Sequence, residues 1–196
     1  MSPPRRSAES TEELRARFVD HAFALIEREG ADALTMRSLA AEADCSVGLA
    51  YKVFADRREL VEAILERELH DLVDLLAQLM TRAGRYSVGA NLAWFASQFI
   101  DSPAVPLVRE VVATGEPAGA PTDSHHEMGD LEAAIGRYLA AEQDLGRVRD
   151  DVDTESVGSL VAGAIHNLVV AGAAWPRPTT AQLRRRMDAV AATIAT

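Results

Sequence analysis

The chain contains little cysteine, few aromatic residues and no long apolar run. Its 196 residues include 1 cysteine, and aromatic side chains make up 5 % of the sequence. A single cysteine excludes an internal disulfide framework and is typical of a reducing compartment. No run of about 18 apolar residues occurs, so we expect a cytoplasmic protein without a membrane-spanning helix.

Catalytic and metal-binding motifs are also scarce. The GxSxG, HExxH and phosphate-binding glycine-rich patterns are absent. The one cluster of metal-ligand residue types, His125-His126-Glu127, lacks helical i, i+4 spacing and a third nearby ligand. We therefore expect no enzyme, no metal and no cofactor. An all-α metal-dependent enzyme is the least favoured alternative.

Helical periodicity is what the sequence has in abundance. Hydrophobic residues make up 48 % of the chain and recur at helical spacing in several long segments, while alternating β-branched runs are almost absent. The predicted fold class is therefore all-α. Residues 115–129, rich in glycine, proline and polar residues, are expected to form the longest loop. Helices are predicted over residues 11–29, 57–81, 87–100, 131–145, 153–175 and 179–194, with a further one starting at Ser102-Pro103.

Residues 35–60 carry the most specific pattern of the chain. Thr35 is a candidate N-cap for a helix that stops at Asp44-Cys45, and Ser46 is a candidate N-cap for a second, shorter helix. A helix of about two turns is too short to be stable alone, so packing against another helix must hold it. This is the helix-turn-helix arrangement, whose second helix lies in the major groove of DNA.

Residues 16–65 resemble the N-terminal DNA-binding domain of the tetracycline-repressor (TetR) family. The resemblance implies an N-terminal helix-turn-helix domain of three helices over residues 1–56, in which residues 1–10 are a disordered arm. It also implies a helical domain for ligand binding and dimerisation over residues 57–196. The matching residues follow in order without a gap and are Ala22, Gly30, Thr35, Leu39, Ala40, Ser46, Gly48, Tyr51, Phe54 and Leu60.

The resemblance also implies which side chains meet DNA. Residues at the start of the first short helix match positions that contact phosphates, and residues at the start of the second would face base edges. Two residues further along the second helix would reach phosphates, and so would Arg57, which stands where the family usually has lysine. The implied contacts are Thr35, Arg37, Ser46, Val47, Gly48, Leu49, Tyr51, Lys52 and Arg57.

Several residues of this segment depart from the family pattern or have a second interpretation. Asp44 replaces the common turn glycine, which is tolerable because Asp adopts a left-handed backbone at modest cost. Leu49 and Val53 also differ from the usual residues, so the operator sequence cannot be read from this helix. Tyr51 and Phe54 can alternatively be core aromatics, and for Phe54 we favour the core.

The net charge of −10 is unusual for a protein that binds DNA. Most of the acidic excess lies beyond residue 60, whereas residues 35–58 carry four basic and three acidic side chains. Phosphate binding depends on local cations more than on net charge. The charge distribution is therefore compatible with DNA binding by the N-terminal domain.

For the rest of the chain, the resemblance implies a ligand-responsive repressor that binds a palindromic operator and releases it when an effector binds. The last two helices, 153–175 and 179–194, would pair with those of a second copy, because a two-fold dimer places two reading heads about one DNA turn apart. An effector-independent helix-turn-helix protein is the alternative. A small apolar or amphipathic effector would contact residues that can equally be core, namely Trp94, Phe95, Gln98, Phe99, His166 and Asn167.

Overall fold

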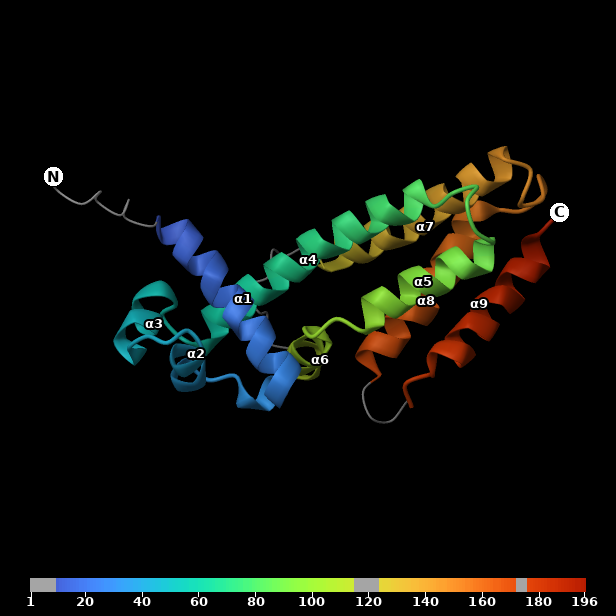
Figure 1. The fold of residues 1–196 in the computed structure, drawn as a ribbon. Coiled ribbons are helices and arrows are strands. Elements are labelled where there is room, and N and C mark those ends of the chain that lie inside the picture. Colours follow the sequence, from blue (N-terminus) through green and yellow to red (C-terminus); the bar gives the residue numbers. More distant parts are fainter. Residues whose placement is uncertain (1–9, 115–123, 172–175) are drawn as a thin grey trace, which may run out of the picture. The chain divides into compact units, whose positions relative to one another are not determined.

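The computed structural model describes residues 10–114, 124–171 and 176–196 and the side chains of these residues except 114 and 124–130. All the regular structure in these ranges is helical (Figure 1), which confirms the predicted all-α class. No helix of the described residues is long and apolar enough to cross a membrane. Along the chain the elements are α1 (Thr11–Glu29), η1 (Ala31–Ala33), α2 (Met36–Glu42), α3 (Val47–Val53), α4 (Arg57–Thr81), α5 (Val88–Ile100), α6 (Val105–Thr114), α7 (Ser124–Asp144), α8 (Thr154–Val170) and α9 (Thr180–Ile194).

The predicted helix bounds hold at α1 and α4 and fail at three other places. α7 begins at Ser124, so the expected loop over residues 115–129 is helical from Ser124 onward, while residues 115–123 lie outside the described part. Once a helix has nucleated, each added residue gains a hydrogen bond, so it extends through polar residues that show no apolar stripe. α6 starts at Val105 because Ser102 closes a turn, its hydroxyl accepting from the Ala104 N–H at 3.1 Å. α8 ends at Val170, before the predicted residue 175.

Contacts divide the chain into two compact units, one ending at Glu66 and the other beginning at Arg67. Helix α4 belongs to both units, because its first ten residues pack with the N-terminal one. The proposed domain boundary at residue 57, where α4 starts, stays a prediction.

The core of the N-terminal unit lies on one face of α1. Phe18, Ala22 and Leu25 are buried there, and the apolar side of α2 packs against them. α1 stops at Gly30, whose φ of 87° and ψ of 165° form a backbone that essentially only glycine adopts. The predicted end of this helix at residue 29 is confirmed.

The C-terminal unit is built from two close helix pairs, α7 on α8 and α5 on α9 (Figure 1). Glycines permit the first approach: a Cβ added at Gly158 would lie 2.6 Å from the backbone nitrogen of Gly136. Within one chain α8 is buried on one side only, because Leu160 and Gly163 are exposed.

A buried polar cluster ties the end of α4 to α5 and α7. Glu142 and Asn91 are both fully buried, and the Tyr138 hydroxyl donates to Glu142 Oε1 at 2.6 Å. The Asn91 amide donates to the Tyr138 hydroxyl and to the Arg82 carbonyl, each at 3.0 Å. Arg147 supplies the opposite charge at 3.1 Å from Glu142. Burial raises the pKa of Tyr138, so it remains a hydroxyl that can donate to Glu142.

Candidate nucleic-acid interface

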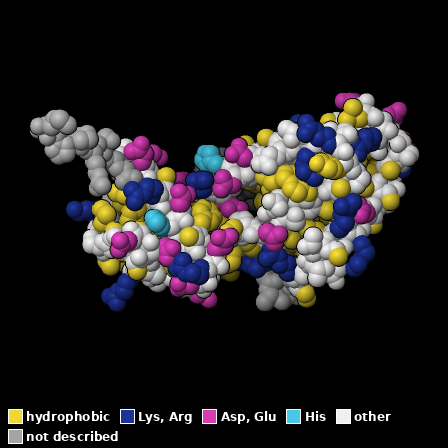
Figure 2. Space-filling view, in the orientation of Figure 1, with side chains coloured by type: hydrophobic (Ala, Val, Ile, Leu, Met, Phe, Trp, Pro, Cys, Tyr) yellow, Lys and Arg dark blue, Asp and Glu magenta, His cyan; other side chains and the backbone are white. Residues whose placement is uncertain are grey.

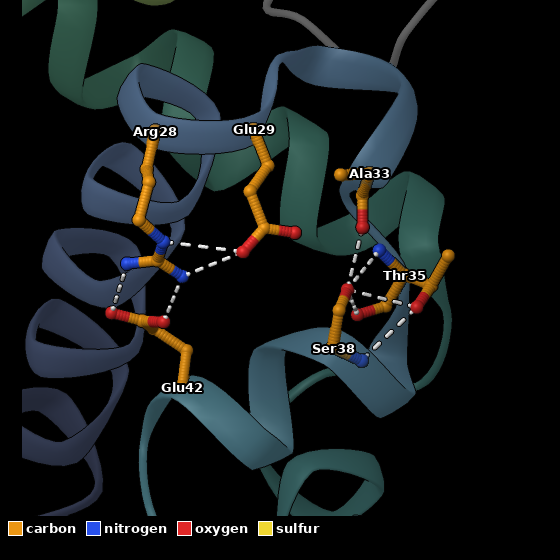
Figure 3. A network of polar contacts seen from close by, with 6 residues as sticks. All are labelled: Arg28, Glu29, Ala33, Thr35, Ser38 and Glu42. Atoms are coloured by element: carbon orange, nitrogen blue, oxygen red, sulfur yellow. Dashed lines mark hydrogen bonds and ion pairs between the residues drawn. The ribbon is translucent and has the colours of Figure 1, made fainter.

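The helix-turn-helix is formed by α2 and α3, which are seven residues each. Thr35 begins α2 with a reciprocal cap: its hydroxyl accepts from the Ser38 N–H at 3.1 Å, and Ser38 Oγ accepts from the Thr35 N–H at 2.9 Å. Ser38 also donates to the Ala33 carbonyl at 2.6 Å, which fixes the chain between η1 and α2 (Figure 3). The N-cap predicted at Thr35 is confirmed.

A left-handed residue makes the turn between the two helices. Asp44 has a φ of 48°, as its substitution for the usual glycine requires. The next N–H, that of Cys45, bonds back to the Ala40 carbonyl at 2.9 Å and closes α2. Ser46 then begins α3, its hydroxyl accepting from the Leu49 N–H at 3.2 Å. The N-cap predicted at Ser46 is confirmed, and the direction of α3 follows from this turn.

A bidentate ion pair joins α2 to α1. Figure 3 shows the Arg28 guanidinium between two carboxylates, those of Glu42 and Glu29. Its two terminal nitrogens lie 3.1 and 2.5 Å from the two carboxylate oxygens of Glu42. Hydrogen bonds from Arg28 hold the pKa of Glu42 below its usual value. The pair is surface-exposed, so it orients α2 more than it stabilises the unit.

A second arginine, Arg15, holds the C-terminal end of α3. Arg15 donates to Glu59 at 2.7 Å and to the Val53 carbonyl at 3.3 Å, and its guanidinium lies 4.4 Å from the ring centroid of Phe54. Glu59 also accepts from the Ala55 N–H at 2.6 Å. Phe54 is fully buried, as we favoured from the sequence. The end of α3 is thus held between α1 and α4.

Most of the predicted DNA contacts lie on exposed surface of this unit. Tyr51 is 54 % exposed, which excludes the core interpretation of its ring, and Val47 is 38 % exposed. Leu49 and Arg57 are half-buried, and Arg57 Nε donates to the Leu34 carbonyl at 2.9 Å. Their roles in DNA contact stay predictions. The exposed ones are Thr35, Arg37, Ser46, Val47, Gly48, Tyr51 and Lys52.

The surface charge near this helix pair is mixed. Figure 2 shows basic and acidic side chains interspersed over the visible face, with no continuous basic patch. Arg58 pairs with Glu62 at 2.6 Å, within α4. Arg37 and Lys52 are exposed, one on each helix of the pair. Any attraction for phosphates from these two helices therefore comes from a few local cations.

The six candidate effector residues have different surroundings. Phe95 is fully buried and stacks on Phe99, with ring centroids 6.1 Å apart. The Arg82 guanidinium covers Trp94, 4.3 Å from its ring centroid. Gln98 and Asn167 are exposed, and partial burial lowers the pKa of the half-buried His166. An open hollow of this unit lies elsewhere, between the start of α5, Arg147 and the end of α9.

The described side chains contain no group of three or more His, Cys, Asp or Glu that could hold a metal ion. The cluster of His125, His126 and Glu127 falls on α7, and its side chains lie outside the described part.

Residues 18–64 match the family model of bacterial regulatory proteins of the tetR family. Three solved structures share the fold. A TetR-family regulator from Pectobacterium atrosepticum is 16 % identical, with a TM-score of 0.63 over 96 % of this chain and 93 % of that one. The ketosteroid transcriptional regulator KstR2 of Mycobacterium tuberculosis is 19 % identical, with a TM-score of 0.60 over 97 % of this chain and 100 % of that one. A putative transcriptional regulator from Saccharomonospora viridis in complex with choline is 18 % identical, with a TM-score of 0.70 over 94 % of this chain and 99 % of that one.

No curated protein matches the chain. The family match covers the helix-turn-helix domain, and the likeness to solved structures extends the shared fold over nearly the whole chain. The resemblance stated from the sequence is thereby confirmed.

Replacing Glu59 with glutamine should lower stability in a pH-dependent way. The Ala55 N–H and the Arg15 guanidinium hold the pKa of Glu59 below its usual value of 4.5. A depressed folded pKa contributes stability above the unfolded pKa, and this is lost as the pH falls through the folded pKa. We expect Glu59→Gln to cost about 0.5–1 kcal/mol at neutral pH, because the pair is only partly exposed. The cost should shrink below pH 4.5.

Urea unfolding at neutral pH and below pH 4.5, at one protein concentration, measures the difference in the free energy of unfolding between Glu59→Gln and the wild type. Glu27→Gln, which alters an exposed carboxylate of α1, is the matched control and should change stability little at either pH. An equal loss for Glu59→Gln at both pH values would contradict the ionic explanation.

Proposed function

We propose that this chain, a DNA-binding transcriptional regulator of the TetR family, is a repressor that binds a palindromic operator as a homodimer and releases it when a small molecule binds. The observation that carries the proposal is the capped, exposed α3 within a domain that matches the family. The second helix of such a pair enters the major groove. The proposal gives the chain no catalytic role.

Phosphate contacts are assigned to the exposed polar residues of α2 and α3. Arg37 and Lys52 supply the positive charge, and Thr35 and Tyr51 supply hydroxyl groups. Such contacts position a protein on the duplex without reading its sequence. Arg57, whose Nε donates to the Leu34 carbonyl at 2.9 Å, lies at the start of α4 and is a further proposed phosphate contact.

Selection from random oligonucleotides with the purified protein tests DNA binding. We expect a palindrome whose half-sites lie about 10 base pairs apart, or a multiple of that spacing. Lys52→Ala should weaken binding to all sequences alike and flatten the slope of log K against log salt by about 2, one phosphate contact per half-site. Arg85→Ala, which removes an exposed cation of the C-terminal unit, is the control and should change neither. Weak binding to every sequence, with no palindrome, would refute operator recognition.

Homodimer formation through α8 and α9 is supported by an exposed stripe on α8. Leu160 is 74 % exposed, and Gly163, Ala164 and Asn167 follow it on the same side. A Cβ added at Gly163 would meet nothing within 4 Å, so packing within the chain does not require glycine there. Glycine weakens a helix, and its use at this exposed position suits close approach by another helix. A second copy of α8 fits this stripe.

Leu160→Arg should convert the dimer to a monomer. Burying a leucine contributes about 1.5–3 kcal/mol, and a two-fold interface contains it twice, so association should weaken by roughly 100-fold or more. Light scattering after size-exclusion chromatography at micromolar concentration measures the mass. Leu145→Arg, at another exposed leucine of the same unit, is the matched control and should remain dimeric. A dimeric Leu160→Arg would place the interface elsewhere.

A small apolar or amphipathic effector is proposed for the C-terminal unit. Two solved structures of similar fold differ in their ligand: one protein is in complex with choline, and the other is a γ-butyrolactone receptor. The chemical class of the effector therefore cannot be transferred from these proteins to this chain. An effector must favour the conformation whose reading heads are wrongly spaced for DNA. Continuous α4, which has residues in both units, is the proposed mechanical link.

An anisotropy titration of labelled operator against a set of small apolar and amphipathic compounds tests effector binding. We expect one class of these compounds to release the operator. Phe99→Ala should raise the compound concentration needed for release at least tenfold, because the contact between the Phe99 ring and the effector is lost. Its operator affinity without compound should stay unchanged. Val112→Ala, an exposed apolar residue of α6, is the control. If no compound alters anisotropy, the effector-independent alternative is favoured.

A further inference from the structure

The outward face of α3 presents apolar groups where a base-reading helix often presents hydrogen-bonding ones. Val47, Gly48, Tyr51 and Lys52 are all exposed on this helix. The hydroxyl of the preceding Ser46 accepts the Leu49 N–H at 3.2 Å and keeps its own O–H as a donor. Within the first turn of α3 itself, the exposed groups are the Val47 isopropyl group and the bare backbone of Gly48.

Packing among the described residues does not require glycine at position 48. Its backbone is helical without a positive φ, and a Cβ there would meet only Ser46 Oγ at 3.9 Å, an ordinary contact. Alanine would fit and would favour the helix more than glycine does. Gly158 is the opposite case, since its Cβ would strike the backbone of Gly136 at 2.6 Å. The space at Gly48 is thus available for a partner that approaches α3 from outside.

Val47, and not Leu49, is the apolar residue turned outward. Leu49 is half-buried, while Val47 is 38 % exposed and belongs to the large hydrophobic residues that the fold leaves uncovered. Both residues are among the DNA contacts implied by the family resemblance, and their exposure favours Val47 for an apolar contact with a base.

We propose that Val47 contacts the C5-methyl group of a thymine in each operator half-site, and that Gly48 lets α3 approach closely enough for this contact. The inference rests on the proposed DNA-binding function and names the base that α3 reads. In the major groove, the thymine methyl is the apolar feature of the base edges, whereas the other edges offer donors and acceptors. An isopropyl group can form hydrogen bonds with neither the donors nor the acceptors, so it favours contact with thymine and disfavours contact with the polar base edges.

Replacing thymine with deoxyuridine removes this methyl group alone. In the selected operator, each thymine is replaced in turn, in both half-sites together, and affinity is measured by anisotropy. Burial of one methyl group is worth about fourfold in affinity, so a dimer should lose about fifteenfold at one position. Val47→Ala should bind thymine and deoxyuridine operators within about twofold of each other, because no isopropyl group remains to meet the methyl.

Three further variants test the same inference. Val47→Thr keeps the β-branch and one methyl group, so it should retain part of the discrimination. Val73→Ala shortens another exposed valine, on the part of α4 in the C-terminal unit, and should discriminate like the wild type. Gly48→Ala should raise the melting temperature while weakening operator binding at least tenfold, a combination that a purely structural role would not give.

Three outcomes would overturn the inference. Wild-type binding could be insensitive to deoxyuridine at every position, or Val47→Ala could keep the full discrimination, or Gly48→Ala could bind as tightly as wild type. In each case a palindrome would still be recognised, so the proposed function would stand. If selection yields no operator at all, the proposed function fails and the inference fails with it.

Discussion

A helix of seven residues has almost no stability of its own, so the geometry of α3 depends on what its inner side packs against. Ala50 and Phe54 are fully buried, and the Phe54 ring meets Phe18 of α1 edge-to-face, with centroids 6.4 Å apart. Arg15 lies over the same ring at 4.4 Å and bonds to the end of α3. This apolar contact, closed by one arginine, holds the helix that would meet DNA. The caps at Thr35 and Ser46 set its direction but could not hold it in place alone.

Because the inner side of α3 carries the packing, its outer side is available for binding. Tyr51 and Phe54, both aromatic and three positions apart, have opposite environments: one ring is 54 % exposed and the other is fully buried. Substitutions on the outer side can therefore alter which bases are contacted without altering where the helix lies. The three departures from the family pattern are not confined to this outer side, because Asp44 lies in the turn, Leu49 is half-buried and Val53 is buried.

Local rules predicted much of the N-terminal unit, and longer-range contacts were beyond them. The caps at Thr35 and Ser46, the left-handed Asp44 and the bounds of α1 and α4 all follow from residues within one or two turns. Arg15 and Glu59 are 44 positions apart, and no spacing in the sequence pairs them. Composition also cannot separate a pocket from a core: Phe95 was a candidate effector contact, and it is fully buried against Phe99. The start of α7 was missed because polar residues join a helix that other residues nucleate.

The role of each glycine likewise depends on contacts that the sequence does not show. The glycines also indicate how the proposed DNA-binding surface of α3 and the proposed dimer surface of α8 depend on each other. Gly158 is required by the backbone of Gly136, whereas Gly48 and Gly163 have open space where a side chain would stand. The latter two lie on α3 and α8, the helices assigned to DNA and to the second copy. A single α2–α3 pair with few cations, in a chain of net charge −10, would bind DNA weakly. Joining two copies makes the second half-site contact intramolecular, which multiplies affinity without any new contact. Under the proposed function, the α2–α3 pair therefore depends on the proposed α8 interface, and loss of that interface should abolish operator recognition even where α3 is intact.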